Sequence, residues 1–295
     1  MKVFFSPHYE VILPGHVWPT SKYRLIAERL AAGPHSAACE FHEPPEASWD
    51  DLGLVHTAEY LAKLRDGTLT ADDIATLELP WQPGFATAFR LMAGGTCAAA
   101  AAALDEGRAA HLGGGLHHAF ANHGEGFCPL NDVAVAIRVA QARHHVRRAA
   151  VVDLDVHHGN GTAMIFERDP DVFTLSIHQQ HNYPFFKPRS GLDVGLEDGA
   201  GDARYLDALR AALPRVLASD PELIVYVAGA DPFEHDRLGG LRLTKAGLAE
   251  RDRLVVQAAR AAGVPLALTL AGGYALDVRD IVDIQTATVE TLLMA

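Results

Sequence analysis

Apolar runs of strand length alternate with longer stretches of helical period along most of the chain. A run such as 223–227 is apolar throughout, as expected for a strand buried on both faces of a parallel sheet. The alternation predicts an α/β fold, in which right-handed crossovers place helices on both faces of a mainly parallel central sheet. The predicted strands are 3–5, a run that ends at Asp155, 172–177, 223–227 and 266–270, and the predicted helices are 21–30, 85–104, 129–145, 161–168, 203–217, 245–262 and 278–294.

The chain shows no internal repeat and no linker, although the segment 49–83 has no clear period and is left unassigned. Its 295 residues are enough for one large α/β domain. We therefore expect a single domain over residues 1–295.

Acidic and histidine side chains gather where predicted strands end. Asp153, Asp155 and His157 occupy every second position, so they point to one side for as long as the strand lasts. Two carboxylates and an imidazole at the end of a buried strand are costly to desolvate unless something compensates their charge. Asp231 follows another predicted strand and should lie along the same edge of the sheet.

Two aspartates and one histidine match a catalytic zinc site, which has three protein ligands and one open position for water. The alternative is that Asp155 and Asp231 only cap the helices that follow them and that His157 is an ordinary core residue. Because the three residues occur with Asp153 at matching strand ends, we favour the metal site.

Three glycine-rich motifs carry further candidate chemistry. His117 and His118 follow three glycines and could hold a water molecule or a substrate oxygen from one side. Tyr274 follows two glycines and could donate its hydroxyl to a developing oxyanion. Phe127, on a loop with glycines on either side, could form the wall of a narrow apolar slot. Taken singly, these motifs also fit a flexible loop, a packed turn and a plain loop hydrophobe.

Charge and cysteine usage narrow the classes of function. The net charge of −12 argues against a nucleic-acid partner and is compatible with cationic substrates. The three cysteines have no paired spacing, which favours a reducing compartment over a disulfide framework. The N-terminal strand stops at Pro7 and lacks the features of a signal peptide. We identify no apolar window of membrane-spanning length, so we expect a cytoplasmic protein without a membrane partner.

Together and in this order, the motifs resemble those of the zinc-dependent histone deacetylase superfamily, which has the arginase-deacetylase fold. The motifs are GGLHH (114–118), GFCPLND (126–132), DLDVHHGNG (153–161), GAD (229–231) and GGY (272–274). The resemblance runs from near residue 1 to near residue 294. The segments SKYR (21–24) and DRLGGL (236–241) are most similar to class IV deacetylases and their bacterial relatives.

The resemblance implies a role for each matching residue. It implies that zinc binds to Asp155, His157 and Asp231. It also implies a catalytic group in which His118 is the main general base and acid, His117 gives electrostatic support, Tyr274 polarises the acyl carbonyl, Asp153 orients His117 and Asn160 lies beside His118. The implied substrate tunnel contains Gly126, Phe127, Tyr183 and Leu238, and an implied structural potassium ion is held by Asp153, Ser176 and Ile177.

The implied reaction is hydrolysis that removes an acetyl or longer acyl group from a lysine side chain of a protein or peptide. The same fold could instead act on acetylated polyamines or other small N-acyl amines, and a non-catalytic reader of acyl-lysine is a further alternative. Asn160 stands where many class I relatives have an aspartate, and a neutral partner would hold the His118 imidazolium less strongly. The loop 179–186 also departs from the class I pattern, so it leaves the acyl preference open.

Overall fold

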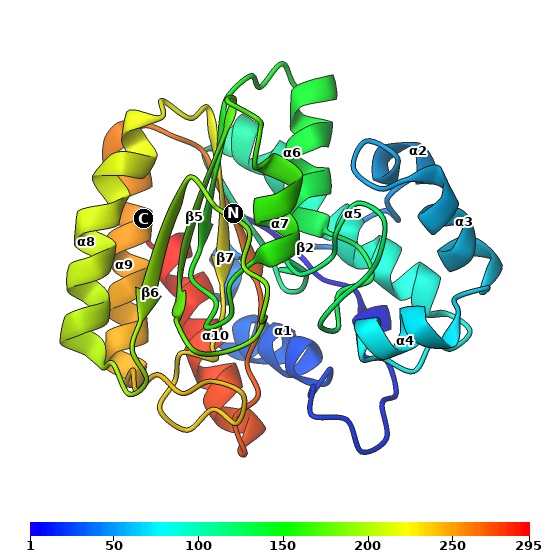
Figure 1. Ribbon diagram of the computed structural model, residues 1–295. Helices are drawn as coiled ribbons and strands as arrows, with labels where there is room; N and C mark the ends of the chain where they lie inside the picture. The colour runs from blue at the N-terminus through cyan, green and yellow to red at the C-terminus, as the bar shows by residue number, and fades with distance from the viewer.

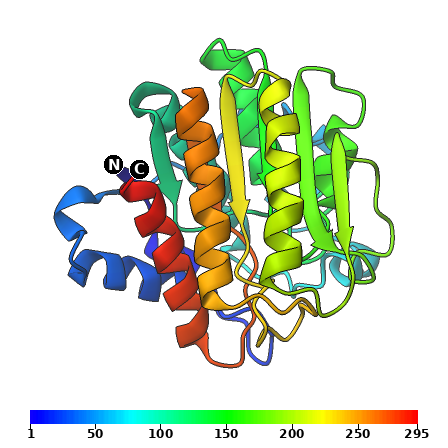
Figure 2. The same cartoon turned by 90° about the vertical axis from the view of Figure 1, so that its left-hand side faces the viewer.

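The fold is built on one sheet whose strands all run in parallel. In the computed structural model, which describes residues 1–295, the eight strands have the order β2-β1-β3-β8-β7-β4-β5-β6. Helices lie on both faces of this sheet, which confirms the predicted α/β architecture (Figures 1 and 2). The strands are β1 (Lys2–Phe4), β2 (Glu40–His42), β3 (Arg108–His111), β4 (Ala149–Asp153), β5 (Val172–Gln179), β6 (Leu192–Leu196), β7 (Leu223–Ala228) and β8 (Leu266–Leu270).

Successive residues of the central strands point to opposite faces and so supply two separate apolar cores. Along β4, Ala150 and Val152 join the core beneath α1, α8, α9 and α10. Ala149 and Val151 join the core beneath α5, α6 and α7. The helices are α1 (Lys22–Ala32), α2 (Trp49–Leu52), α3 (Ala58–Asp66), α4 (Ala71–Leu77), α5 (Phe85–Glu106), α6 (Asp132–Arg143), α7 (Asn160–Phe166), α8 (Asp202–Ala218), α9 (Lys245–Ala262) and α10 (Val278–Leu293).

A third apolar cluster holds the segment that the sequence left unassigned. The segment 49–83 forms the helices α2, α3 and α4, which lie beside α5 at one end of the molecule (Figure 1). Tyr60 and Leu64 of α3 and Leu77 of α4 pack in this cluster with Phe89 of α5. These helices are short, and each begins at a Ser or Thr whose side chain accepts from a backbone amide, which supports the first turn.

Several predicted boundaries need correction. β4 ends at Asp153 rather than at Asp155, and α6 begins at Asp132 rather than at 129. The pattern also missed β2, β3 and β6. β2 and β6 are the two edges of the sheet, where little apolar side-chain surface is buried, and β3 is only four residues long.

Helix α5 corrects the expectation that no window has membrane-spanning character. An 18-residue window of this helix has a mean hydropathy of 1.2, so by length and composition alone the helix could cross a membrane. However, 67% of that window is buried within the protein. Ala99 and Ala103 pack into the core between α5, α6 and the sheet. We therefore read α5 as a core helix.

Candidate metal and catalytic centre

The site lies at the carboxyl edge of the central strands, where the chain after β4 turns twice. The Asp153 carboxylate accepts a hydrogen bond from the amide of Asp155, with Oδ1 at 3.2 Å from the nitrogen. The Asp155 carboxylate repeats this contact with the amide of His157, at 3.0 Å. Such bonds between an aspartate and the amide two residues later compete with sheet hydrogen bonds. They explain why β4 stops at Asp153 and why the next side chains turn into the site.

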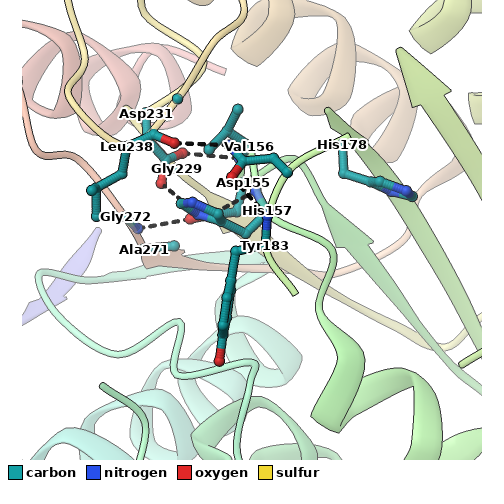
Figure 3. A network of polar contacts seen from close by, with 12 residues as sticks. Asp155, Val156, His157, His178, Tyr183, Gly229, Asp231, Leu238, Ala271 and Gly272 are labelled. Atoms are coloured by element: carbon teal, nitrogen blue, oxygen red, sulfur yellow. Dashed lines mark hydrogen bonds and ion pairs between the residues drawn. The ribbon is translucent and has the colours of Figure 1, made fainter. Parts of the chain in front are cut away.

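Asp155, His157 and Asp231 come together as the sequence predicted, although Asp231 follows a different strand, β7 (Figure 3). One potential ligand atom from each residue lies within 4.8 Å of the other two. His157 Nδ1 is 3.0 Å from Asp155 Oδ1 and 3.5 Å from Asp231 Oδ2. The alternative role in helix capping does not hold, since the N-cap of α7 is Gly159 and the next helix after Asp231 begins at Lys245.

The donor set fits a divalent cation. Asp231 Oδ1 accepts from the amide of Val156 at 2.9 Å, but Asp231 Oδ2 is buried and has no hydrogen-bond partner. Burial and the nearby Asp155 carboxylate raise the pKa of Asp231 to about 7. Burial would lower the pKa of His157, yet the two carboxylates raise it to about 10. A bound cation would satisfy the unpaired oxygen and offset the repulsion between the two carboxylates.

Glycine at position 272 is required for this close approach. A Cβ atom there would collide with Asp231 Oδ2, and Gly272 N donates to Asp155 Oδ2 at 2.8 Å. The chain that follows β8 thus places Gly272 against both aspartates, two residues before Tyr274.

The two adjacent histidines lie beside the metal ligands with distinct partners. His117 Nδ1 is 2.6 Å from Asp153 Oδ2, and His118 Nδ1 is 2.7 Å from Asn160 Oδ1. The two Nε2 atoms lie 3.1 Å apart. Burial alone would lower the pKa of His117, but Asp153 and Asp155 raise it to about 9. Burial and the charges of His117 and His157 lower the pKa of His118 well below its ordinary value, so His118 is the neutral member of the pair.

The predicted tunnel residues line a cleft of about 180 Å³ that leads to these groups. It is lined by Glu78, His118, Gly126, Phe127, His157, Asn182, Tyr183, Leu238 and Tyr274. A smaller cavity of about 30 Å³ lies beside the metal ligands and is bounded by Trp18, Tyr23, Leu116 and Cys128. The Tyr274 ring centroid is 6.0 Å from that of Phe127 and 6.5 Å from that of His157. The cleft therefore has aromatic walls and polar groups at its inner end.

Two acidic residues of the site were missed by sequence reasoning. Glu125 Oε1 accepts from Asn160 Nδ2 at 2.7 Å and from the Tyr183 hydroxyl at 3.1 Å. Asp236 Oδ2 accepts from the Tyr274 amide at 2.6 Å, and its Oδ1 accepts from the Leu238 amide at 2.8 Å. Glu125 accepts hydrogen bonds from side chains of the site, and Asp236 accepts them from backbone amides of its loops. Neither residue follows a strand end or a motif spacing that would mark it in the sequence.

The residues predicted for potassium lie together on neighbouring strands. Ser176 of β5 is in register with Asp153 of β4, and Ile177 follows it. The Ser176 hydroxyl is 3.0 Å from His178 Nδ1. His178 also belongs to a second group that could hold a metal, with His158 and Asp193. None of these residues lines the cleft, and Asp153 alone among them contacts a catalytic side chain, through its bond to His117.

Comparisons with known proteins agree with the motifs and the fold. The Histone deacetylase domain family matches residues 16–291. Histone deacetylase 2 of Arabidopsis thaliana is 32% identical, covering 93% of this chain and 74% of the relative. The Histone deacetylase-like amidohydrolase of Pseudomonas aeruginosa is 33% identical, covering 88% and 73%. The crystal structure of the HDA15 HD domain matches with a TM-score of 0.83 at 28% identity, covering 100% of this chain and 91% of that one. The chain therefore belongs to the histone deacetylase family of hydrolases.

Proposed function

We propose that this protein is a zinc-dependent hydrolase that removes an acyl group from the side-chain amine of lysine. The observation that carries this proposal is the buried, unpaired Oδ2 of Asp231, which faces His157 beside a second carboxylate at the inner end of the cleft. Asp155, His157 and Asp231 would hold the ion. When bound, zinc supplies a Lewis acid that polarises the acyl carbonyl and lowers the pKa of water.

The surroundings of the two histidines favour the protonation states that amide hydrolysis needs. The lowered pKa of His118 favours its neutral form, and its Nδ1 faces Asn160. The lone pair on its Nε2, which lies 3.1 Å from His117 Nε2, would take a proton from the attacking water. The same nitrogen would return that proton to the leaving amine. His117 would remain protonated beside Asp153 and stabilise negative charge, and Tyr274 would donate its hydroxyl to the developing oxyanion.

The cleft suits the stem of an acylated lysine. Once acylated, the lysine side chain is uncharged, so an apolar slot between Phe127 and Tyr183 can take it without desolvating an ammonium group. The aromatic walls would contact its methylene groups, and Leu238 would add a further apolar surface. We expect the substrate to be an acyl-lysine protein or peptide, and the reaction to take place in the cytoplasm without nucleic acid or a membrane. We also propose that a structural potassium ion binds at Asp153, Ser176 and Ile177.

The test is a turnover assay on purified protein with its zinc content measured on the same sample. An acetyl-lysine peptide, a longer acyl-lysine peptide and acetylputrescine are compared at equal concentration. We expect release of the free acid from at least one lysine substrate, and greater turnover of it than of acetylputrescine. Binding of acyl-lysine without release of acid would favour the reader, and preference for acetylputrescine would favour a polyamine hydrolase. A zinc-loaded protein that neither binds nor cleaves any of them would exclude the proposal.

A further inference from the structure

We infer that Glu125 is a positioning residue that acts through the Asn160 amide and thereby fixes which nitrogen of His118 carries a proton. The role of this proton in turnover rests on the proposed function, whereas its location on the imidazole ring can be measured without turnover. No motif or comparison assigns a role to Glu125.

Glu125, Asn160 and His118 form a chain of two hydrogen bonds in which each donor and acceptor is fixed. An ionised carboxylate accepts hydrogen bonds and cannot donate them. Because Glu125 Oε1 is 2.7 Å from the Asn160 side chain, the amide must turn its NH2 group towards Glu125. The Asn160 oxygen then faces His118 Nδ1 at 2.7 Å, and that nitrogen must carry the proton. The lone pair of His118 is left on Nε2, the nitrogen that faces His117.

Nothing else among the side-chain contacts of Asn160 holds its amide in this orientation. Asn160 is fully buried, and its side chain has hydrogen bonds only to His118 and Glu125. The two ends of an amide are nearly equal in shape, so without Glu125 the group could turn over. Its NH2 would then donate to His118 Nδ1 and favour the tautomer with a proton on Nε2. That tautomer cannot accept a proton where the proposed reaction needs it.

Glu125 is held in place by a tight turn of its own. The Glu125 amide donates to the Cys128 carbonyl at 3.1 Å, and the Cys128 amide donates back to the Glu125 carbonyl at 2.9 Å. Gly126 and Phe127, between them, have φ values of 51° and 68°, in the left-handed region. Burial would raise the pKa of Glu125, but hydrogen bonds from His123, Asn160 and Tyr183 lower it below its ordinary value, so the carboxylate stays ionised.

Glu125 Oε1 also accepts from the Tyr183 hydroxyl at 3.1 Å. One carboxylate therefore holds both the Tyr183 side of the cleft and the Asn160 amide. Loss of Glu125 therefore has two effects that can be separated. Tyr183→Phe removes the bond to the wall alone, and we expect it to change KM more than kcat. Glu125→Gln keeps an acceptor oxygen for both bonds, and we expect kcat to stay within about 5-fold of wild type. Glu125→Leu removes the acceptor of both bonds, and we expect kcat to fall about 10–100-fold, with a change in KM no larger than that in Tyr183→Phe.

Rescue distinguishes positioning from a general structural role. In an Asn160→Asp variant either carboxylate oxygen can accept from His118, so the orientation no longer needs Glu125. We expect the Asn160→Asp, Glu125→Leu double variant to keep kcat within about 3-fold of Asn160→Asp alone. Zinc content and circular dichroism of every variant show whether the site and the fold are intact. If wild type is active and the kcat of Glu125→Leu is within 3-fold of the wild-type value, the inference is wrong. It is also wrong if the loss of kcat caused by Glu125→Leu persists in the Asn160→Asp background.

The tautomer can also be measured on zinc-loaded protein by 15N NMR of the imidazole nitrogens. We expect the His118 proton on Nδ1 in wild type and in Glu125→Gln, and at least partly on Nε2 in Glu125→Leu. An unchanged tautomer in Glu125→Leu would overturn the inference whether or not the enzyme turns over. An inactive wild type with the expected NMR change would reject the proposed function and leave the role of Glu125 standing.

Discussion

Arg251 is a fully buried cation that ties together the two segments that carry the metal ligands. Its Nη1 donates to the Gly229 carbonyl at 2.6 Å and to the Leu154 carbonyl at 3.3 Å, next to the segments of Asp231 and Asp155. Its Nε donates to Asp252 Oδ1 at 2.9 Å. The perturbation we propose is Arg251→Met, which keeps an unbranched side chain in the core but removes the charge and every donor.

The expected cost follows from what the substitution leaves behind. Breaking a buried ion pair by removing one partner typically costs about 3–5 kcal/mol, because the other charge stays buried. Asp252 keeps hydrogen bonds from the hydroxyls of Tyr226 and Thr288, which places the ionic cost near the lower limit. The lost bonds to two carbonyls add about 1 kcal/mol each. We therefore expect Arg251→Met to lower the free energy of unfolding by about 5 kcal/mol and to weaken zinc binding about 10–100-fold.

The assay is urea unfolding in the presence of a chelator, followed by a separate zinc titration. Arg253→Met is the matched control, since Arg253 lies on the same helix, is 46% exposed and pairs with Glu250 at the surface. An exposed pair of this kind contributes about 0–1 kcal/mol. If Arg251→Met destabilises the protein no more than Arg253→Met does, the buried network does not support the ligand segments and our reasoning is wrong.

Three further outcomes can be checked. Tyr274→Phe should retain zinc and lose about 10²–10³-fold in kcat, since one oxyanion donor is removed; metal analysis with kinetics tests this, and an unchanged kcat would remove Tyr274 from the mechanism. Asp231→Asn should lose zinc on dialysis, yet its metal-free form should unfold at no lower temperature than metal-free wild type, because one of two buried like charges is gone; calorimetry gives the comparison. Burial lowers the pKa of His56 to about 4, and its Nε2 accepts from the Asn131 amide. The unfolded chain binds a proton at His56 at higher pH than the folded protein does. The free energy of unfolding should therefore decrease as the pH is lowered from 6.5, by about 2 kcal/mol between pH 7 and pH 5. Urea unfolding of His56→Gln should show a smaller dependence on pH.

The sequence predicted those parts of the site that local pattern specifies. Asp155 and Asp231 each follow an apolar run, so the rule that parallel strands end at one edge was enough to bring them together. Glu125 and Arg251 could not be predicted in this way, because their roles depend on contacts with residues such as Asn160 that are distant in the chain. Lys22 is a clear example. It is the first residue of an amphipathic helix, yet its side chain is fully buried and donates to the Ala271 carbonyl at 2.7 Å.

The parallel pairing of β4 with β7 determines how precisely Asp231 is positioned relative to Asp155. Asp153 lies opposite Val227, and this pairing sets how far Asp231 extends past the sheet relative to Asp155. A shift of the two strands by one residue would displace Asp231 by about 3.3 Å, whereas metal–ligand bonds tolerate deviations of only about 0.2 Å. It would also turn the apolar side chains of β7 towards the wrong core. The packing of alternate apolar side chains of β7 into the two cores therefore fixes the distance between the metal ligands.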